Sequence, residues 1–222
     1  MYKIEYFIFA YLDNIIHLTI ILSLKMTEFT STQSTVNTIN TSAEGYLELW
    51  LGPMFSGKTT QLIQTYKKFA YIGKRVVVVN YAEDKRYHNT MLSTHDQVMI
   101  PCVQSTNLQA IMGDLMLADV ILINEGQFFQ DLYEVVLALV EEHGKMVYIC
   151  ALDGDFERKK FGRVLDLIPY CDKVSKLHAL CSMCRNGKLA IFSHRVSNEA
   201  EQIVIGSDNY VPLCRACYLR EP

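Results

Sequence analysis

Eight consecutive residues constrain the fold of this chain more than any other feature of its sequence. They read Gly-Pro-Met-Phe-Ser-Gly-Lys-Thr from position 52 to position 59 and fit the pattern G-x-x-x-x-G-K-[ST]. The apolar run Tyr46–Leu51 precedes them, and Thr59–Ile72 follows with apolar side chains at helical spacing, closed by Gly73. A strand, a glycine-rich turn and a helix in this order surround phosphate groups with main-chain N–H groups. The sequence therefore predicts a nucleotide-binding P-loop.

Each part of this loop has an expected role in binding ATP. The glycines allow the tight turn, Lys58 reaches the β- and γ-phosphates, and Thr59 supplies a hydroxyl to Mg²⁺. We therefore assign all eight positions to the ATP site: Gly52, Pro53, Met54, Phe55, Ser56, Gly57, Lys58 and Thr59.

Strand and helix patterns alternate beyond the loop, which indicates a parallel sheet with right-handed crossovers. The predicted fold is α/β, a RecA-like P-loop parallel sheet flanked by helices, over residues 46–178. We expect further strands at Arg75–Asn80, Asp119–Ile123 and Met146–Leu152, and further helices at Leu108–Leu117 and Asp131–His143.

Four of the seven cysteines form two C-x-x-C pairs, Cys181 with Cys184 and Cys214 with Cys217. Two such pairs can present four thiolates to Zn²⁺ at about 2.3 Å. Two disulfides or free thiols are the alternatives, and the odd cysteine count and sparse spacing favour a reducing, cytoplasmic location. Residues 179–222 hold little apolar material, so we expect a small zinc-stapled region there, called the lid below.

Bulk composition argues against nucleic acid as the main partner. The chain has 222 residues, half of them hydrophobic, a formal charge of -3 and a pI of about 6.1. Proteins that grip DNA or RNA usually show a basic excess or stripe. A P-loop alone does not identify the acceptor, however, so a P-loop ATPase whose zinc ribbon binds nucleic acid stays open as an alternative.

A carboxylate follows one of the predicted strands. In parallel α/β sheets, ligands bind at the carboxyl ends of strands, so Glu125 should face the same crevice as Lys58. It could accept a proton from an attacking hydroxyl or water. From position alone, a solvated loop glutamate is the alternative.

These motifs together resemble those of the type II thymidine kinases. The resemblance rests on Gly52–Thr59, on Glu125-Gly126-Gln127-Phe128-Phe129, on Leu152-Asp153-Gly154 followed by Phe156 and Arg158-Lys159, and on the paired C-x-x-C motifs. It runs from about Tyr46 to Tyr218. It implies transfer of the γ-phosphate of ATP to the 5′-hydroxyl of thymidine, with deoxyuridine as a second substrate.

The resemblance also implies residue roles. Glu125 matches the catalytic base, and Phe128 and Phe156 match residues lining the thymine pocket. The ATP site would also include Asp84, Lys85, Arg86, Asn124 and Gln127, and the nucleoside site would include Ile203, Val204, Ile205, Gly206 and Tyr210.

Two positions need separate comment. The family usually has Asp where this chain has Asn124, so we expect weaker Mg²⁺ binding unless another acid such as Asp84 compensates. Phe192-Ser193-His194-Arg195 resembles an aromatic-hydroxyl-basic stretch of the family, in which we expect His194 and Arg195 to be solvated.

The resemblance implies further properties that composition cannot show. These are a homotetramer, dTTP as feedback inhibitor, and neither nucleic acid nor membrane as a partner. A kinase acting on a different deoxynucleoside remains a third interpretation.

Residues 1–45 resist a single interpretation. Ile4–Leu24 is rich in apolar residues, but Asp13 near its centre would cost roughly 2.5–3.5 kcal/mol on insertion into a bilayer. Thr27–Ser42 is rich in Ser, Thr and Asn, a composition typical of disorder. A dispensable leader with Met26 as the true start is favoured over an amphipathic helix or a targeting signal.

Overall fold

The structure is a computed structural model that describes residues 44–82, 91–93, 98–204, 206 and 208–220. The predictions for nearly all of the leader 1–45, and for Asp84, Lys85, Arg86 and Ile205, lie outside these ranges. The chain divides into two compact units, and the described residues all belong to Ser42–Pro222.

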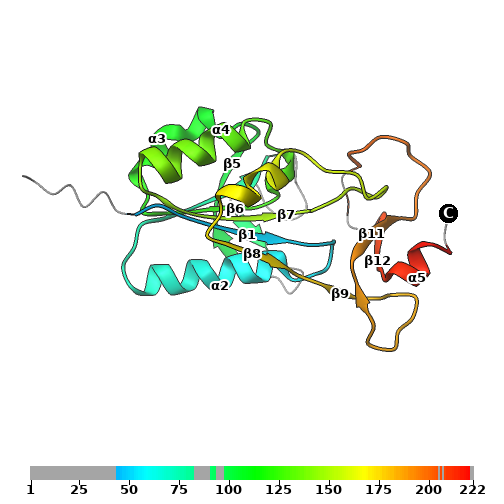
Figure 1. Cartoon of the computed structure of the whole chain (residues 1–222). Coiled ribbons are helices and arrows are strands. Elements are labelled where there is room, and N and C mark those ends of the chain that lie inside the picture. The colour runs from blue at the N-terminus through cyan, green and yellow to red at the C-terminus, as the bar shows by residue number, and fades with distance from the viewer. Residues whose placement is uncertain (1–43, 83–90, 94–97, 205, 207, 221–222) are drawn as a thin grey trace, which may run out of the picture. The chain divides into compact units, whose positions relative to one another are not determined.

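The centre of this unit is a parallel sheet (Figure 1). In the described part of the chain it has six strands in the order β5-β2-β6-β7-β1-β8, and every neighbouring pair is parallel. Their bounds are Tyr46–Leu51 (β1), Val76–Tyr81 (β2), Val103–Ser105 (β5), Val120–Ile123 (β6), Met146–Ala151 (β7) and Lys173–Lys176 (β8). The central strands are continuous apolar runs because both faces of the sheet are covered.

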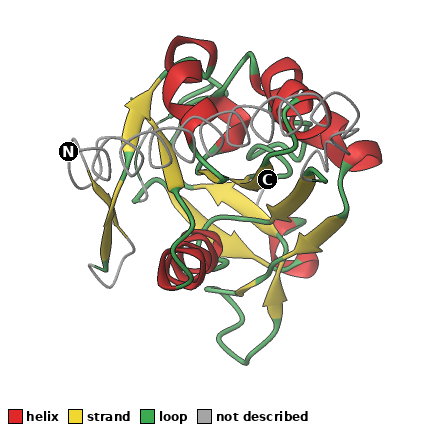
Figure 2. Ribbon diagram, turned by 90° about the vertical axis from the view of Figure 1, so that its left-hand side faces the viewer, coloured by secondary structure: helices red, strands yellow, loops and turns green. Residues whose placement is uncertain are grey.

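Helices cover the two faces separately, and Figure 2 shows them on both sides of the sheet. One face packs on helix α2 (Lys58–Tyr71), where Leu62 and Ile63 meet Trp50 and Tyr148. The other face packs on α3 (Met112–Leu117) and α4 (Leu132–Leu137). The expected α/β fold of a parallel sheet flanked by helices is therefore confirmed.

Two predicted helices are broken into pieces. The helix expected at Leu108–Leu117 begins as a 3-10 turn, η2 (Gln109–Ile111), before α3. The helix expected at Asp131–His143 widens after α4 into a π-helical turn, η4 (Ala138–Glu142). Apolar spacing alone does not distinguish these tighter and wider turns from a regular α-helix, because all three bury one side of the segment.

Several further segments, β5 among them, carried no prediction. β8 lies at the sheet edge and is mostly exposed, so it lacks the apolar signature of a buried strand. Short strands β3 (Met91–Ser93) and β4 (Met99–Pro101) pair with each other, and a 3-10 segment, η5 (Val164–Tyr170), precedes β8.

The lid consists of short elements around the cysteines. Two antiparallel pairs form there: β9 (Ala179–Leu180) with β10 (Leu189–Ala190), and β11 (Phe192–Arg195) with β12 (Tyr210–Leu213). A short helix, α5 (Arg215–Tyr218), completes it. Its buried cluster is small and contains three of the four paired cysteines.

No helix among the described residues combines the length and the apolar character needed to cross a membrane.

Candidate active site

A single cleft joins the P-loop, the carboxyl end of the sheet and the lid. It encloses about 1330 Å³ of empty space, part of it open to solvent. Glu125 and Asn124 reach it from the end of β6, and Lys58 and Thr59 reach it from the start of α2. The expected crevice that brings Lys58 and Glu125 together is thus present.

The P-loop has the conformation that its glycines require. Gly57 caps α2 with a left-handed backbone, and a side chain at Gly52 would meet the carbonyl oxygen of Leu177 at 2.4 Å. Lys58 is only 8% exposed and donates hydrogen bonds from Nζ to the carbonyl oxygens of Gly52 (3.1 Å) and Pro53 (2.7 Å). Its ammonium group is therefore held within the loop, next to the cleft.

Not every predicted loop residue faces the cleft. Met54, Phe55, Gly57, Lys58 and Thr59 line it, whereas Gly52, Pro53 and Ser56 are not among its lining residues. The Ser56 hydroxyl donates to the carbonyl of Pro53 at 2.8 Å, which stabilises the turn itself.

Glu125 is placed by an unusual backbone conformation. It follows β6 with φ of 54°, a left-handed conformation that few non-glycine residues adopt and that is often found at functional sites. Its carboxylate accepts a hydrogen bond of 2.7 Å from the side-chain amide of Gln127. Gln127 is itself buried, and its side-chain oxygen accepts from the N–H of Leu152 at 3.0 Å. Gln127 therefore lies behind Glu125 and holds it, rather than lining the cleft.

A chain of neutral amides surrounds Asn124. The side-chain N–H of Asn124 donates to Oδ1 of Asn80 at 2.9 Å, and the amide of Asn80 donates to Oε1 of Gln104 at 3.3 Å. Asn124 is 2% exposed and Asn80 is 3% exposed. Position 124, directly after β6, is thus occupied by a buried amide with an amide partner.

Aromatic rings form one wall of the cleft. Phe128 stacks on Tyr81 with centroids 5.0 Å apart and meets Phe161 edge-on at 5.4 Å. All three line the cleft, as does Phe156. Phe128 and Phe156 were predicted, but Tyr81 and Phe161 were not, because an aromatic residue at a strand end or in a loop carries no local signal of a pocket.

The lid closes the cleft through the loop between β11 and β12. Ile203, Val204, Gly206 and Tyr210 line the cleft as predicted. The hydroxyl of Ser193 also lines it and accepts a hydrogen bond of 2.9 Å from the N–H of Met54, so the lid contacts the P-loop directly.

The expectation of a solvated side chain is wrong for Arg195, whereas His194 stays partly exposed. Arg195 is 6% exposed and its guanidinium lies 3.8 Å from the ring centre of Phe156. His194 is half-buried and meets the ring of Tyr218 edge-on at 5.7 Å. Residues 193 and 195 are buried while 192 and 194 are less so, an alternation typical of a strand with one covered face.

Sequence analysis missed Asp155, which links the lid to the sheet. Asp155 is buried, and its Oδ1 accepts from the N–H groups of Glu157 (3.0 Å) and Lys159 (2.8 Å). Its Oδ2 accepts from the side-chain amide of Gln202 at 2.7 Å. An aspartate followed by several charged residues has the composition of an exposed turn, so no local pattern indicates this contact.

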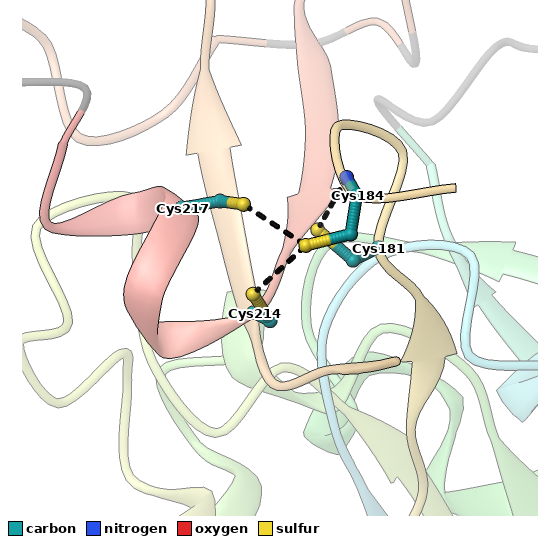
Figure 3. Close-up of side chains that lie close together, drawn as sticks. All are labelled: Cys181, Cys184, Cys214 and Cys217. Carbon is teal, nitrogen blue, oxygen red and sulfur yellow. Dashed lines mark hydrogen bonds between the residues drawn. The ribbon is translucent and has the colours of Figure 1, made fainter. Parts of the chain in front are cut away.

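The four paired cysteines converge on one point, and Figure 3 shows their side chains directed toward one another. Their sulfur atoms lie within 4.8 Å of each other, and Cys184 is 3.7 Å from Cys214 and 3.2 Å from Cys217. A disulfide requires about 2.05 Å, so none is formed, whereas tetrahedral Zn–S bonds of about 2.3 Å place sulfurs about 3.8 Å apart. The cluster can therefore hold a metal ion.

The surroundings favour a thiolate at Cys181, whereas side-chain hydrogen bonds with Cys217 and Cys214 raise the pKa of Cys184 to about 12. Burial raises the pKa of Cys181, but main-chain N–H groups of Cys184, Cys214 and Met183 outweigh it and lower that pKa to about 6. A guanidinium N–H of Arg220 also donates to the sulfur of Cys217 at 3.2 Å. Thiolates are the form that binds metal ions.

Comparison with known proteins identifies relatives over the same region. A sequence model described as "Thymidine kinase" matches residues 45–218. A thymidine kinase of Yaba monkey tumor virus is 40% identical over 180 residues, which cover 81% of this chain and 97% of the relative. A cytosolic thymidine kinase of Gallus gallus is 38% identical over 178 residues, 80% of this chain and 78% of the relative. Among solved structures, a DNA replication initiation factor aligns with a TM-score of 0.41 at 12% identity, over 61% of this chain and 41% of its own, a likeness too weak to support an inference.

Proposed function

This chain belongs to the thymidine kinase family, an ATP-dependent group of phosphotransferases, and we propose that it transfers the γ-phosphate of ATP to the 5′-hydroxyl of thymidine. The observation that carries this proposal is the shared cleft: one cavity is lined by the P-loop, by Glu125 and by the lid loop. A triphosphate and a nucleoside bound there would lie on either side of Glu125.

Glu125 acts as the catalytic base in this proposal. It accepts the proton of the 5′-hydroxyl while that oxygen forms a bond to the γ-phosphorus and the bond to the β–γ bridging oxygen breaks, which releases ADP. The hydrogen bond from Gln127 fixes the carboxylate, and such a base typically contributes about 10²- to 10⁴-fold in rate. Lys58 offsets phosphate charge, and Arg86 is proposed to approach the phosphates with Asp84 and Lys85 beside it.

The thymine ring is proposed to bind among the aromatic residues and the lid loop. Phe128 and Phe156 supply apolar faces, and the main chain of residues 203–206 with Tyr210 supplies polar groups. A site that hydrogen-bonds one base edge rejects others because its buried polar groups are then left unpaired.

Mg²⁺ would be held by Thr59 and Asn124, which both line the cleft. A bound Mg²⁺ ion neutralises charge on the phosphate groups. Asn124 offers a neutral oxygen in place of a carboxylate, so we propose that the metal is bound more weakly here than in relatives with Asp.

Zinc is the metal proposed for the cysteine cluster. Four thiols at tetrahedral spacing form a closed donor set, which is typical of structural rather than catalytic zinc. We propose a division into a catalytic region 46–178, a zinc-bearing lid 179–222 and a dispensable leader 1–45. Deoxyuridine as second substrate, inhibition by dTTP, a homotetramer and a cytoplasmic location are proposed on family membership.

The decisive experiment is a substrate screen with the purified chain. ADP release and the mass of the nucleotide product are measured with ATP and Mg²⁺ for each of the four common deoxynucleosides, with zinc determined on the same sample. Thymidine-dependent formation of dTMP, unaffected by added DNA, is the expected result. ADP release that needs no nucleoside and rises with single-stranded DNA would support the ATPase alternative, and preference for another deoxynucleoside would reassign the substrate.

A further inference from the structure

Arg195 occupies a distinctive place in the lid. It is the last residue of β11 and pairs across the ladder with Tyr210, the first residue of β12. The two residues therefore stand at opposite ends of the loop 196–209, part of which lines the cleft. A side chain directed inward from either end can contact several described residues of this loop.

The guanidinium of Arg195 gathers main-chain oxygens of this loop. Nη1 donates to the carbonyl oxygens of Glu199 (2.9 Å) and Glu201 (2.5 Å), and Nη2 donates to that of Gln202 (3.0 Å). Nε and Nη2 also donate to the hydroxyl of Tyr210, at 3.2 and 2.7 Å. That hydroxyl in turn donates to the carbonyl oxygen of Val204 at 3.1 Å.

The same group contacts the opposite wall of the cleft. Its central carbon lies 3.8 Å from the ring centre of Phe156, within the range of a cation–π interaction. A buried cation is costly unless dipoles or charges compensate it, and the carbonyl oxygens and aromatic faces around Arg195 provide that compensation. Arg195 thus joins the lid loop to the aromatic wall.

We propose that Arg195 is a positioning residue that sets nucleoside affinity and specificity by holding the loop 199–204 in its binding conformation before the nucleoside arrives. The inference rests on the proposed function, since it concerns the nucleoside side of the same cleft. Because Arg195 occupies the carbonyl groups of residues 199, 201, 202 and, through Tyr210, 204, the polar groups that remain can face the ligand. Lysine cannot replace it, because an ammonium lacks the planar fork that reaches several carbonyls at once.

Kinetics of Arg195→Lys and Arg195→Ala test this proposal. Removing hydrogen bonds from a charged donor should raise KM for thymidine by about tenfold or more while KM for ATP changes less than about twofold. Discrimination between thymidine and deoxycytidine should fall as well, and added guanidinium ion at millimolar concentration should partly restore Arg195→Ala. The matched control is Arg75→Ala, which removes the same charge from an exposed ion pair with Asp119 at the amino-terminal end of β2.

A second measurement does not depend on catalysis. Hydrogen–deuterium exchange of residues 196–204 in the protein without nucleoside should be faster in Arg195→Ala and Arg195→Lys, while zinc content and exchange in α2 stay at wild-type values. If Arg195→Ala does not fold, Arg195→Lys carries both measurements.

The outcomes separate this proposal from the proposed function. Unchanged exchange in the loop, equal rises in both KM values, or full activity of Arg195→Lys would overturn the role of Arg195, even in a chain that phosphorylates thymidine. A wild-type chain with no thymidine kinase activity would overturn the proposed function instead, while faster loop exchange in the variants would still support the holding of the loop.

Discussion

Different interactions stabilise the sheet region 46–178 and the lid 179–222. The sheet region buries long apolar strands between helices on two faces, and its largest cluster contains only apolar side chains. The lid buries a few side chains around its cysteines and contains one buried arginine and short hairpins. The first region is stabilised by the apolar surface that it buries. The second depends on a few specific interactions, so the loss of any one of them should destabilise it.

The largest expected effect lies in the sheet region. Loss of the Glu125 carboxylate should lower turnover without lowering the affinity for ATP. Glu125→Gln should lower kcat by about 100-fold or more, because the proposed general base is removed while the shape of the cleft is kept. Turnover and binding of an ATP analogue measure the two effects, and Glu141→Gln, an exposed change on η4, is the control. Retention of most of the activity in Glu125→Gln would show that another group takes the proton.

Loss of one of the proposed zinc ligands should affect the lid before it affects the sheet region. Cys214→Ser should lower zinc content and raise KM for thymidine by roughly tenfold, with a smaller change in KM for ATP, because the lid has little apolar core to replace the metal. Elemental analysis and steady-state kinetics measure this, with Cys171→Ser, a free thiol outside the cluster, as the control. A variant that keeps its zinc would count against the four-thiolate site.

Asn124 offers a smaller change within the sheet region. Asn124→Asp should lower the Mg²⁺ concentration needed for half-maximal activity by about threefold, because a carboxylate binds Mg²⁺ more strongly than an amide. The gain is limited by Asn80, which accepts a hydrogen bond from the Asn124 amide that a carboxylate cannot donate. Titration of activity with Mg²⁺ measures this concentration for both proteins, and Asn107→Asp on the exposed surface is the control. An unchanged requirement would mean that residue 124 has no part in binding the metal.

The smallest expected effect lies outside both regions. Removal of residues 1–25 should change kcat/KM by less than about twofold, since the family match begins at residue 45. Activity of the shortened chain, compared with the full chain at equal zinc content, measures this. A loss of activity would add the leader to the functional unit.

The sequence predicted the central sheet because long apolar strands have few alternative structures. β1, β2, β6 and β7 all lie within one residue of their expected bounds. β8 was missed because an exposed edge strand needs no apolar pattern, and η5 was missed because proline at position 169 interrupts helical spacing.

The sequence motifs predicted which residues reach the cleft, but not which residues those side chains contact. Lys58 and Glu125 reach one cleft as the motifs indicated, but Gln127 turned out to support Glu125 from behind. Arg195 and Asp155 were misjudged or missed because charge in a sequence indicates exposure by default. Their burial depends partly on partners far along the chain, up to 47 residues away, which only the folded chain brings near.

The bond between the main chain of Met54 and the hydroxyl of Ser193 has a consequence for how the two ligands communicate. It joins the turn proposed to bind phosphate to the strand that precedes the loop proposed to bind the nucleoside, so we expect a shift of either element to perturb the other. Thermodynamic linkage is reciprocal. If bound nucleotide changes the affinity for the nucleoside by some factor, bound nucleoside must change the affinity for the nucleotide by the same factor. Ser193→Ala should weaken this coupling, so that the two substrates bind more nearly independently of each other.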